Sequence, residues 1–423
     1  MDTVTITLFG AVLGMVLAIA LILMKFNPTY SMMLGALAGG VAGGAGAAGT
    51  VTFMLGGVGD IVSAIVRIVA AGTLAGVLAD SGAAETISDA IIRAFGKKYA
   101  VVALVVCGWV LCVAGIFGDV VILTIAPIGL DMAYKLKRSR RSILICLIGG
   151  VMSGVGSGPI ANTIAAAEAF GVSITSVMAA GLVPSLAGIF ATAACAAFAS
   201  RRGELVAQPP VMEEKAGRPG LMGAAAGPIL TIFLLLLKPV CNISIDPVIA
   251  MPAGAVAGTL AMGRWKFFRQ YVEYGLNKMS GVAMLLIGTG CLAGIISNSA
   301  IQEAVVAAIE YLGLPSFILA PAAGVLLGGA TASATAGATT ASQIFGPILI
   351  EAGVGRVAAA SMINTGAIML AGLPHGSFFH VSAGSVQMDL KERLKVIPYE
   401  AAIGGAMVAV SALVLGVLKW FGS

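Results

Sequence analysis

Long apolar runs recur from one end of this chain to the other, and few charged side chains interrupt them. Of the 423 residues, 59% are apolar and only 10% are charged, whereas a soluble protein carries roughly 25% charged residues. Only helices and closed barrels satisfy their backbone polar groups in lipid, and the short alternating segments of a barrel are missing from the sequence. The chain is therefore predicted to be an all-α polytopic protein of the lipid bilayer.

Helix-sized apolar runs predict about 10 transmembrane helices. They lie near residues 4–24, 30–48, 60–79, 143–170, 175–199, 221–240, 247–262, 280–297, 357–383 and 400–420. Two further stretches, 99–134 and 315–352, each consist of two helix-sized pieces that meet at a polar, glycine-rich tip. We predict that these two stretches are re-entrant hairpins, each preceded by an interfacial helix, at residues 80–98 and 298–313.

The two halves of the chain resemble each other. AGTLAGVLADSGA at 71–83 aligns with TGCLAGIISNSAI at 289–301, and each match is followed by a predicted interfacial helix, a hairpin, an interrupted span and one more span. We predict a first repeat over residues 1–200, a cytoplasmic linker over 201–220 and a second, inverted repeat over 221–423.

The distribution of basic residues predicts the orientation of the repeats. If the termini lie outside, the predicted cytoplasmic loops contain all 24 lysines and arginines except Arg67, Lys238, Arg356 and Lys419. This bias satisfies the positive-inside rule, since cytoplasmic loops are enriched in Lys and Arg. The net charge of +5 reflects the same bias, and no nucleic-acid partner is expected.

Two predicted spans are interrupted by glycine and proline. The interruptions are SGVGSGPIANT at 153–163, within the broken helix 143–170, and GLPHGSFFHVSAG at 372–384, at the end of the broken helix 357–383. Non-helical backbone at membrane depth is tolerated only where it is buried in protein or lines a cavity. Inverted repeats with broken helices are typical of secondary transporters, and the exposed helix N-termini favour an anion. The two breaks and the two hairpin tips are predicted to meet at a binding site.

Hydroxyl and amide side chains at these four places are the candidate substrate ligands. The predicted substrate-binding residues are Ser157, Gly158, Asn162, Thr163, Thr331, Ser333, Thr335, Thr339, His375 and Ser377. Such groups suit a sugar acid or a hydroxy acid, and no Lys or Arg lies at any of the four places. The alternative is structural, because Ser and Thr in membrane helices often bond to their own turn or to a neighbouring helix.

Two ionisable residues are candidates for proton coupling. Asp119 lies at the first hairpin tip, and an intramembrane carboxylate is a functional hypothesis by default. His375 follows the second break directly, and the pKa of histidine is about 6.5 before any perturbation. His380 is interpreted as a buried structural histidine, and Arg67 and Glu168 as structural residues near a membrane interface.

The sequence offers little that suits an enzyme. The motifs of the common hydrolases, kinases and dehydrogenases are missing. Its two histidines, His375 and His380, have no Cys or acidic residue nearby, so we expect no metal site, no cofactor and no catalytic residues.

The tips and breaks resemble those of the gluconate permease family of proton symporters, which belongs to a wider ion-transporter superfamily. The resemblance covers nearly the whole chain and is carried by LAGVLADSGAAETISDAIIRAFGKK, FGDVVILTIAPIG, SGPIANTIAAAEAFGV, GGATASATAGATTAS and GLPHGSFF. In the family an acidic residue likewise follows Phe at the first tip, matching Asp119. The resemblance implies a homodimer in the inner membrane, with a scaffold of outer spans and an elevator-like transport domain of hairpins and broken helices.

The leading hypothesis is a proton-coupled symporter of a small organic anion, such as gluconate or a short hydroxy acid. Leu-Pro-His at 373–375 replaces the Asn-Asp pair of gluconate-type members and is closer to members that carry short hydroxy acids. A sodium-coupled carboxylate transporter is the second reading, although neither tip has the Ser-Asn-Thr triplet of the dicarboxylate relatives. An anion channel is the third, and it would not need two hairpins in opposed halves.

Overall fold

The computed structural model describes residues 6–24, 26–96, 99–200, 202–206, 217–241, 243, 245–300, 304, 311, 315–374 and 376–421. Helices make up most of this part of the chain. Extended segments pair there only at two isolated bridges, Ile6 with Ser299 and Ser139 with Leu205. The prediction of an all-α protein is therefore confirmed.

Within the described ranges, four helical stretches are long and apolar enough to cross a membrane. They are α3 (Gly46–Asp80), α9 (Ile174–Ala199), Trp265–Ser297 with α12 (Phe268–Ser297), and Leu390–Val417 with α18 (Leu390–Leu394) and α19 (Ile397–Ser411). Large apolar side chains face outward, for example Phe190 with 73% and Phe233 with 58% of their surface exposed. Such faces suit contact with lipid, where an apolar side chain has no reason to be buried.

The predicted spans 60–79 and 280–297 are shorter than the helices that contain them. α3 is one helix of 35 residues and α12 one of 30 residues. The two helices pack against each other at glycines: a Cβ atom at Gly76 would lie 2.1 Å from the carbonyl oxygen of Tyr271, and one at Gly57 would lie 2.2 Å from that of Gly290. Close backbone approach of this kind is typical of membrane helices, and here it favours long helices in contact along their length.

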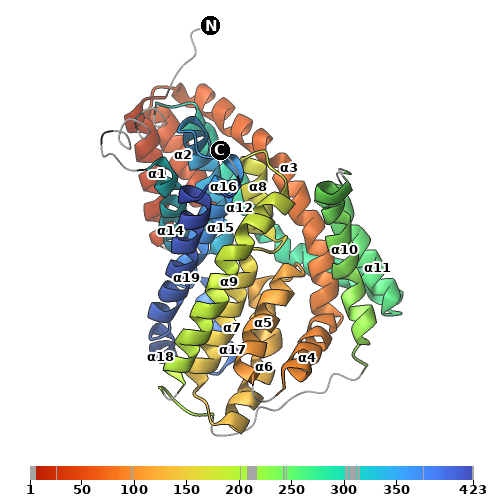
Figure 1. The fold of residues 1–423 in the computed structure, drawn as a ribbon. Coiled ribbons are helices and arrows are strands. Elements are labelled where there is room, and N and C mark those ends of the chain that lie inside the picture. The colour runs from red at the N-terminus through yellow and green to blue at the C-terminus, as the bar shows by residue number, and fades with distance from the viewer. Residues whose placement is uncertain are drawn as a thin grey trace.

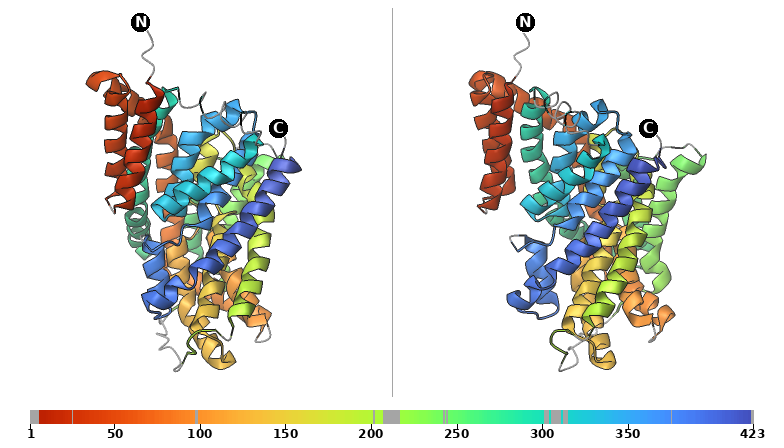
Figure 2. Two further views of the ribbon diagram at one scale, coloured as in Figure 1. Left: turned by 90° about the vertical axis from the view of Figure 1, so that its left-hand side faces the viewer. Right: turned by 60° about the vertical axis from the view of Figure 1, so that its left-hand side comes forward.

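Two helix pairs flank α3 and α12. α1 (Leu8–Leu23) packs on α2 (Pro28–Ala42), and α10 (Leu221–Cys241) packs on α11 (Pro247–Ala261). α2 contacts both long helices, and α11 contacts α3. Figure 2 shows α1 and α2 at one edge of the molecule, and Figure 1 shows α10 and α11 at the opposite edge.

Each predicted hairpin is a helix–turn–helix, and each predicted break separates two helices. The first hairpin consists of α5 (Ala100–Val113) and α6 (Gly118–Leu136), and the second of α14 (Leu319–Thr331) and α15 (Ala334–Glu351). α7 (Arg140–Val155) is separated from α8 (Ala161–Ala169), and α16 (Arg356–Met369) from α17 (Ser377–Ser385). α4 (Ala83–Phe95) is the predicted helix before the first hairpin. Its predicted counterpart at 298–313 lies largely outside the described residues.

The described part of the chain begins and ends toward the same end of the molecule, and the turn between α6 and α7 lies at the opposite end (Figure 1). α9 ends near that turn, where Ser139 donates a hydrogen bond to the carbonyl oxygen of Ala199 at 2.9 Å. The predicted linker after α9 lies partly outside the described residues.

Candidate functional site

A cavity of about 300 Å³ lies where the two hairpin tips and the two helix breaks meet. α12 and α19 complete its wall. The lining from the tips and breaks includes Gly118 and Asp119, Ile160 and Asn162, Ser333 and Thr335, and Gly372 and Ser377. The four segments that the sequence singles out therefore contribute to one cavity.

The cavity brings together about half of the predicted site residues. Asp119, Asn162, Ser333, Thr335 and Ser377 line it. The others that the structure describes lie outside its lining: Ser157, Gly158, Thr163, Thr331 and Thr339. His375 lies outside the described residues.

A pair of buried amides connects the first break to α16. The Nδ2 atom of Asn162 donates a hydrogen bond to Oδ1 of Asn364 at 2.5 Å, and Nδ2 of Asn364 donates to the hydroxyl of Thr163 at 3.3 Å. Asn364 was missed by the sequence analysis. The signal that could have found it is the Asn-Thr dipeptide at 162–163, which recurs at 364–365 in the other broken helix.

Ser157 and Gly158 hold the first break against α5. The indole N–H of Trp109 donates to the hydroxyl of Ser157 at 3.3 Å. A Cβ atom at residue 158 would lie 2.4 Å from the carbonyl oxygen of Cys112, so a larger residue would not fit there. Both residues fix the break against α5 and lie outside the cavity lining.

The second tip uses several hydroxyls for local structure. The Ser333 side chain caps α15 by accepting a hydrogen bond from the Ala336 N–H at 3.2 Å. The Thr331 hydroxyl donates to the carbonyl oxygen of Leu327, one turn earlier, at 2.7 Å. The hydroxyl of Thr339 is buried and has no hydrogen-bond partner among the described residues. Thr335 lines the cavity.

The second break packs directly on the second tip. A Cβ atom at Gly376 would lie 2.3 Å from the carbonyl oxygen of Ala332. Ser377 follows as the first residue of α17 and is exposed. His380 is also exposed, not buried as the sequence suggested, and its Nε2 atom lies 2.9 Å from the carbonyl oxygen of Pro374.

Among the described residues, three ionisable side chains line the cavity. Asp119 is half-buried in the first turn of α6, Lys278 is an exposed residue of α12, and Glu400 of α19 is 4% exposed. Lys278 lies within α12, which begins ten residues before it, and not in a loop as the sequence predicts. Glu400 was missed because nothing in the sequence of its span distinguishes it from an interfacial carboxylate.

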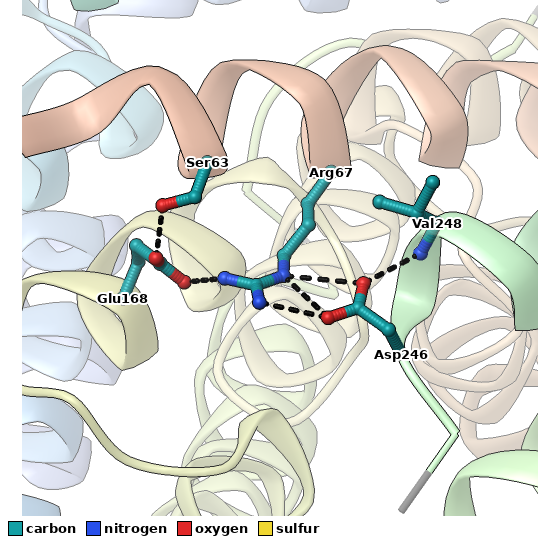
Figure 3. Close-up of polar contacts among 5 residues, drawn as sticks. All are labelled: Ser63, Arg67, Glu168, Asp246 and Val248. Atoms are coloured by element: carbon teal, nitrogen blue, oxygen red, sulfur yellow. Dashed lines mark hydrogen bonds and ion pairs between the residues drawn. The ribbon is translucent and has the colours of Figure 1, made fainter. Parts of the chain in front are cut away.

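A second polar cluster lies at the C-terminal end of α8 (Figure 3). Arg67 of α3 forms an ion pair with Glu168 at the end of α8, and its Nη2 atom lies 2.7 Å from Oδ2 of Asp246, the N-cap residue of α11. Ser63 also donates to Glu168. The hydrogen bonds from Arg67 hold the pKa of Asp246 below its usual value. Together with Ser173 and others, the three charged residues line a cavity of about 320 Å³.

Comparisons with known proteins point to one family. Residues 3–418 match the GntP family permease description. An uncharacterized transporter of Haemophilus influenzae is 44% identical over 417 residues, which cover 98% of this chain and 100% of that protein. An uncharacterized permease of the same organism is 22% identical over 456 residues, which cover 97% of this chain and 93% of that permease.

Two solved structures share the fold at low sequence identity. The YdaH transporter of Alcanivorax borkumensis has a TM-score of 0.66 and 13% identity, with 90% of each chain covered. MtrF of Neisseria gonorrhoeae, which represents a class of antimetabolite efflux pumps, has a TM-score of 0.62 and 14% identity, with 88% of this chain and 85% of that chain covered. At these identities the likeness concerns the fold alone.

Proposed function

This chain belongs to the GntP permease family as a multi-pass transporter of the bacterial inner membrane, and we propose that it is a proton-coupled symporter of a small organic acid. The observation that carries this proposal is the cavity at the junction of both tips and both breaks. Broken helices at a binding site are typical of secondary transporters. A continuous water-filled pore would not require them.

The substrate class follows from the groups on the cavity wall. Asn162, Ser333, Thr335 and Ser377 supply amide and hydroxyl groups, and Lys278 supplies a positive charge. A volume of about 300 Å³ lies at the lower end of the range for small-molecule pockets. Sugar acids such as gluconate, and shorter hydroxy acids, combine one carboxylate with hydroxyls and suit such a wall.

Proton coupling follows from the carboxylates on the same wall. An organic anion entering the cavity is repelled by an ionised Asp119, and protonation removes that repulsion. Asp119 is therefore a proposed candidate for the group whose proton occupancy is linked to substrate, beside Glu400 on the same wall. His375, the other candidate from the sequence, is proposed on its position after the second break alone.

The transport movement is proposed from the order of the helices. We assign residues 1–200 and 221–423 to two inverted repeats, joined by the linker 201–220. α1 to α3 and α10 to α12 would form the scaffold and the contact of a homodimer, while the hairpins and broken helices would move as an elevator. The matched segments 71–83 and 289–301 begin in α3 and α12, which pack together, and this supports the assignment.

Uptake by proteoliposomes tests the proposal. Purified full-length protein is reconstituted, and accumulation of gluconate, glycerate and lactate is measured under an imposed proton gradient or an imposed sodium gradient. We expect accumulation above equilibrium for at least one acid with the proton gradient only. Accumulation driven by sodium alone would favour the sodium-coupled reading, and uptake that never exceeds equilibrium would favour a channel.

A further inference from the structure

A buried arginine–carboxylate pair lies beside the cavity, outside the segments that the sequence singles out. Glu400 of α19 lines the cavity and is 4% exposed, whereas Arg393 of α18 is completely buried. The Nη2 atom of Arg393 lies 2.6 Å from Oε1 of Glu400. Charged residues are rarely buried unless paired, and a buried pair at a cavity wall is a functional candidate.

Arg393 is held in place by α17. Its Nε atom donates a hydrogen bond to the hydroxyl of Ser382 at 3.0 Å, and its guanidinium carbon lies 4.6 Å from the centre of the Phe379 ring. Its Nη1 atom has no hydrogen-bond partner among the described residues. α17 starts at Ser377, on the cavity wall. The same short helix therefore contributes to the cavity and positions the arginine.

Glu400 contacts the backbone of the second break. A Cβ atom at Gly372 would lie 2.4 Å from Oε2 of Glu400, so the carboxylate occupies space that only a glycine leaves free. Gly372 and Glu400 both line the cavity, and Arg393 lies outside the lining. The carboxylate thus separates the guanidinium from the space proposed for the substrate.

Few other titratable groups lie near this pair in the part of the chain that the structure describes. There, Glu400 forms its ion pair with Arg393. Asp119 and Lys278 line the same cavity. His380 of α17 contacts Pro374, and Arg140 of α7 bonds to the backbone of Gln387. The other charged or titratable residues on the helices packed against α19 are Arg141 and Cys146 of α7, Cys195 of α9 and Arg356 of α16.

We propose that Glu400 binds the coupling proton and that its protonation releases Arg393 to balance the carboxylate of the substrate. This inference rests on the proposed function. Before binding, the guanidinium and the carboxylate neutralise each other. When one proton binds Glu400 and one anion enters the cavity, the neutral acid leaves the guanidinium paired with the anion. The total charge of the site is unchanged, so no buried charge lacks a partner in either state.

Each ligand then favours the other. Protonation without the anion leaves Arg393 unpaired, and the anion without the proton adds a second negative charge beside Glu400. Such coupling is reciprocal by thermodynamic necessity. Where Glu400 is ionised before the anion binds, the affinity of the wild type for the anion should fall about tenfold per pH unit as pH rises.

Glu400→Gln in the full-length protein tests the inference. Gln resembles the protonated acid in shape, so we expect exchange of the transported acid between the two sides of the vesicle to persist. Accumulation driven by the proton gradient should fall to the level without a gradient, and the affinity should change less than about twofold per pH unit. Glu392→Gln is the matched control, because Glu392 pairs with Arg141 at 2.6 Å and does not line the cavity.

The double variant Arg393→Gln/Glu400→Gln covers the case in which the single variant does not fold, and it should likewise lose both accumulation and pH dependence. If the wild type accumulates gluconate, glycerate or lactate with protons and the folded Glu400 variants do so with an unchanged pH profile, this inference is overturned while the proposed function stands. If the wild type shows no proton-driven accumulation, the proposed function fails and the inference fails with it.

Discussion

The cluster of Arg67 with Glu168 and Asp246 and the pair of Arg393 with Glu400 both join opposite charges within this apolar chain, and they differ in exposure. The side chains of Arg67, Glu168 and Asp246 are 27%, 23% and 39% exposed, whereas those of Arg393 and Glu400 are 0% and 5% exposed. An exposed ion pair contributes little because water solvates the separated charges almost as well. A buried pair cannot separate unless each charge finds a substitute.

The two sets of ion pairs also differ in the helices that they connect. Arg67 connects α3 and α11, which we assign to the scaffold, with α8, which we assign to the moving part. Under the proposed elevator movement, an ion pair at such a boundary has to be weak enough to break in each cycle. Arg393 and Glu400 connect α18 with α19 beside the cavity, and α17 holds the arginine. Under the proposal above, this pair changes partners and is never left with a single charge.

The largest expected effect comes from removing the buried cation. Arg393→Met leaves Glu400 without its partner and should lower the free energy of unfolding by about 3–5 kcal/mol. The loss should be smaller at pH 5 than at pH 8, since a buried carboxylate without a counter-charge takes up a proton. Thermal unfolding in detergent at both pH values measures this. If the double variant Arg393→Gln/Glu400→Gln, where neither charge remains, loses as much unfolding free energy as Arg393→Met, then the unpaired charge of Glu400 is not the cause of the loss.

The buried amide pair is the uncharged counterpart of these clusters, and its loss should have a smaller effect. Asn162→Ala leaves Asn364 without its 2.5 Å partner, and a buried polar group without a partner costs about 1–3 kcal/mol. We expect a loss of substrate affinity of roughly 5- to 150-fold with a smaller loss of folded yield. Binding to purified protein measures the affinity. Thr331→Ala is the control, because that hydroxyl bonds within its own helix.

The sequence alone predicts much of the fold and part of the site. Apolar runs and glycine-rich polar interruptions are local signals, so the tips and breaks that meet at the cavity are recognisable from the chain itself. The partners of the candidate residues are not. Asn162 and Asn364 lie 202 positions apart, and only the packed helices bring them together. Glu400 and Lys278 belong to spans without an interruption, and nothing local shows that their side chains reach the cavity.

Removing the partly exposed cation, Arg67, should have a modest effect and sharpens the comparison between the two clusters. Arg67→Met should lower the free energy of unfolding by about 1 kcal/mol, because each exposed pair contributes a fraction of that amount. The difference from the wild type should shrink in 1 M salt, where the Debye length is about 3 Å. For Arg393→Met we expect little change with salt. Unfolding of both variants at low and high salt distinguishes them, and a salt-independent loss at Arg67 would contradict the exposed-pair explanation.

The smallest expected effect is the pH dependence that Asp246 contributes. Its pKa is lowered in the folded protein, first by the hydrogen bonds from the Arg67 guanidinium and further by the N–H of Val248. A group with a lowered pKa stabilises the fold above its unfolded value, about 3.9 for Asp, and this contribution disappears as pH falls through the lower, folded value. Asp246 is partly exposed, so solvent reduces the effect to a fraction of a kcal/mol.

Wild type should therefore lose slightly more stability than Asp246→Asn between pH 5 and pH 3, when thermal unfolding in detergent is compared across that range. Arg67→Met should reduce the acid sensitivity at least as much as Asp246→Asn, because it removes the arginine partner of both Asp246 and Glu168. An acid sensitivity that Asp246→Asn leaves intact would place its origin in other carboxylates, such as Glu168 on the same arginine.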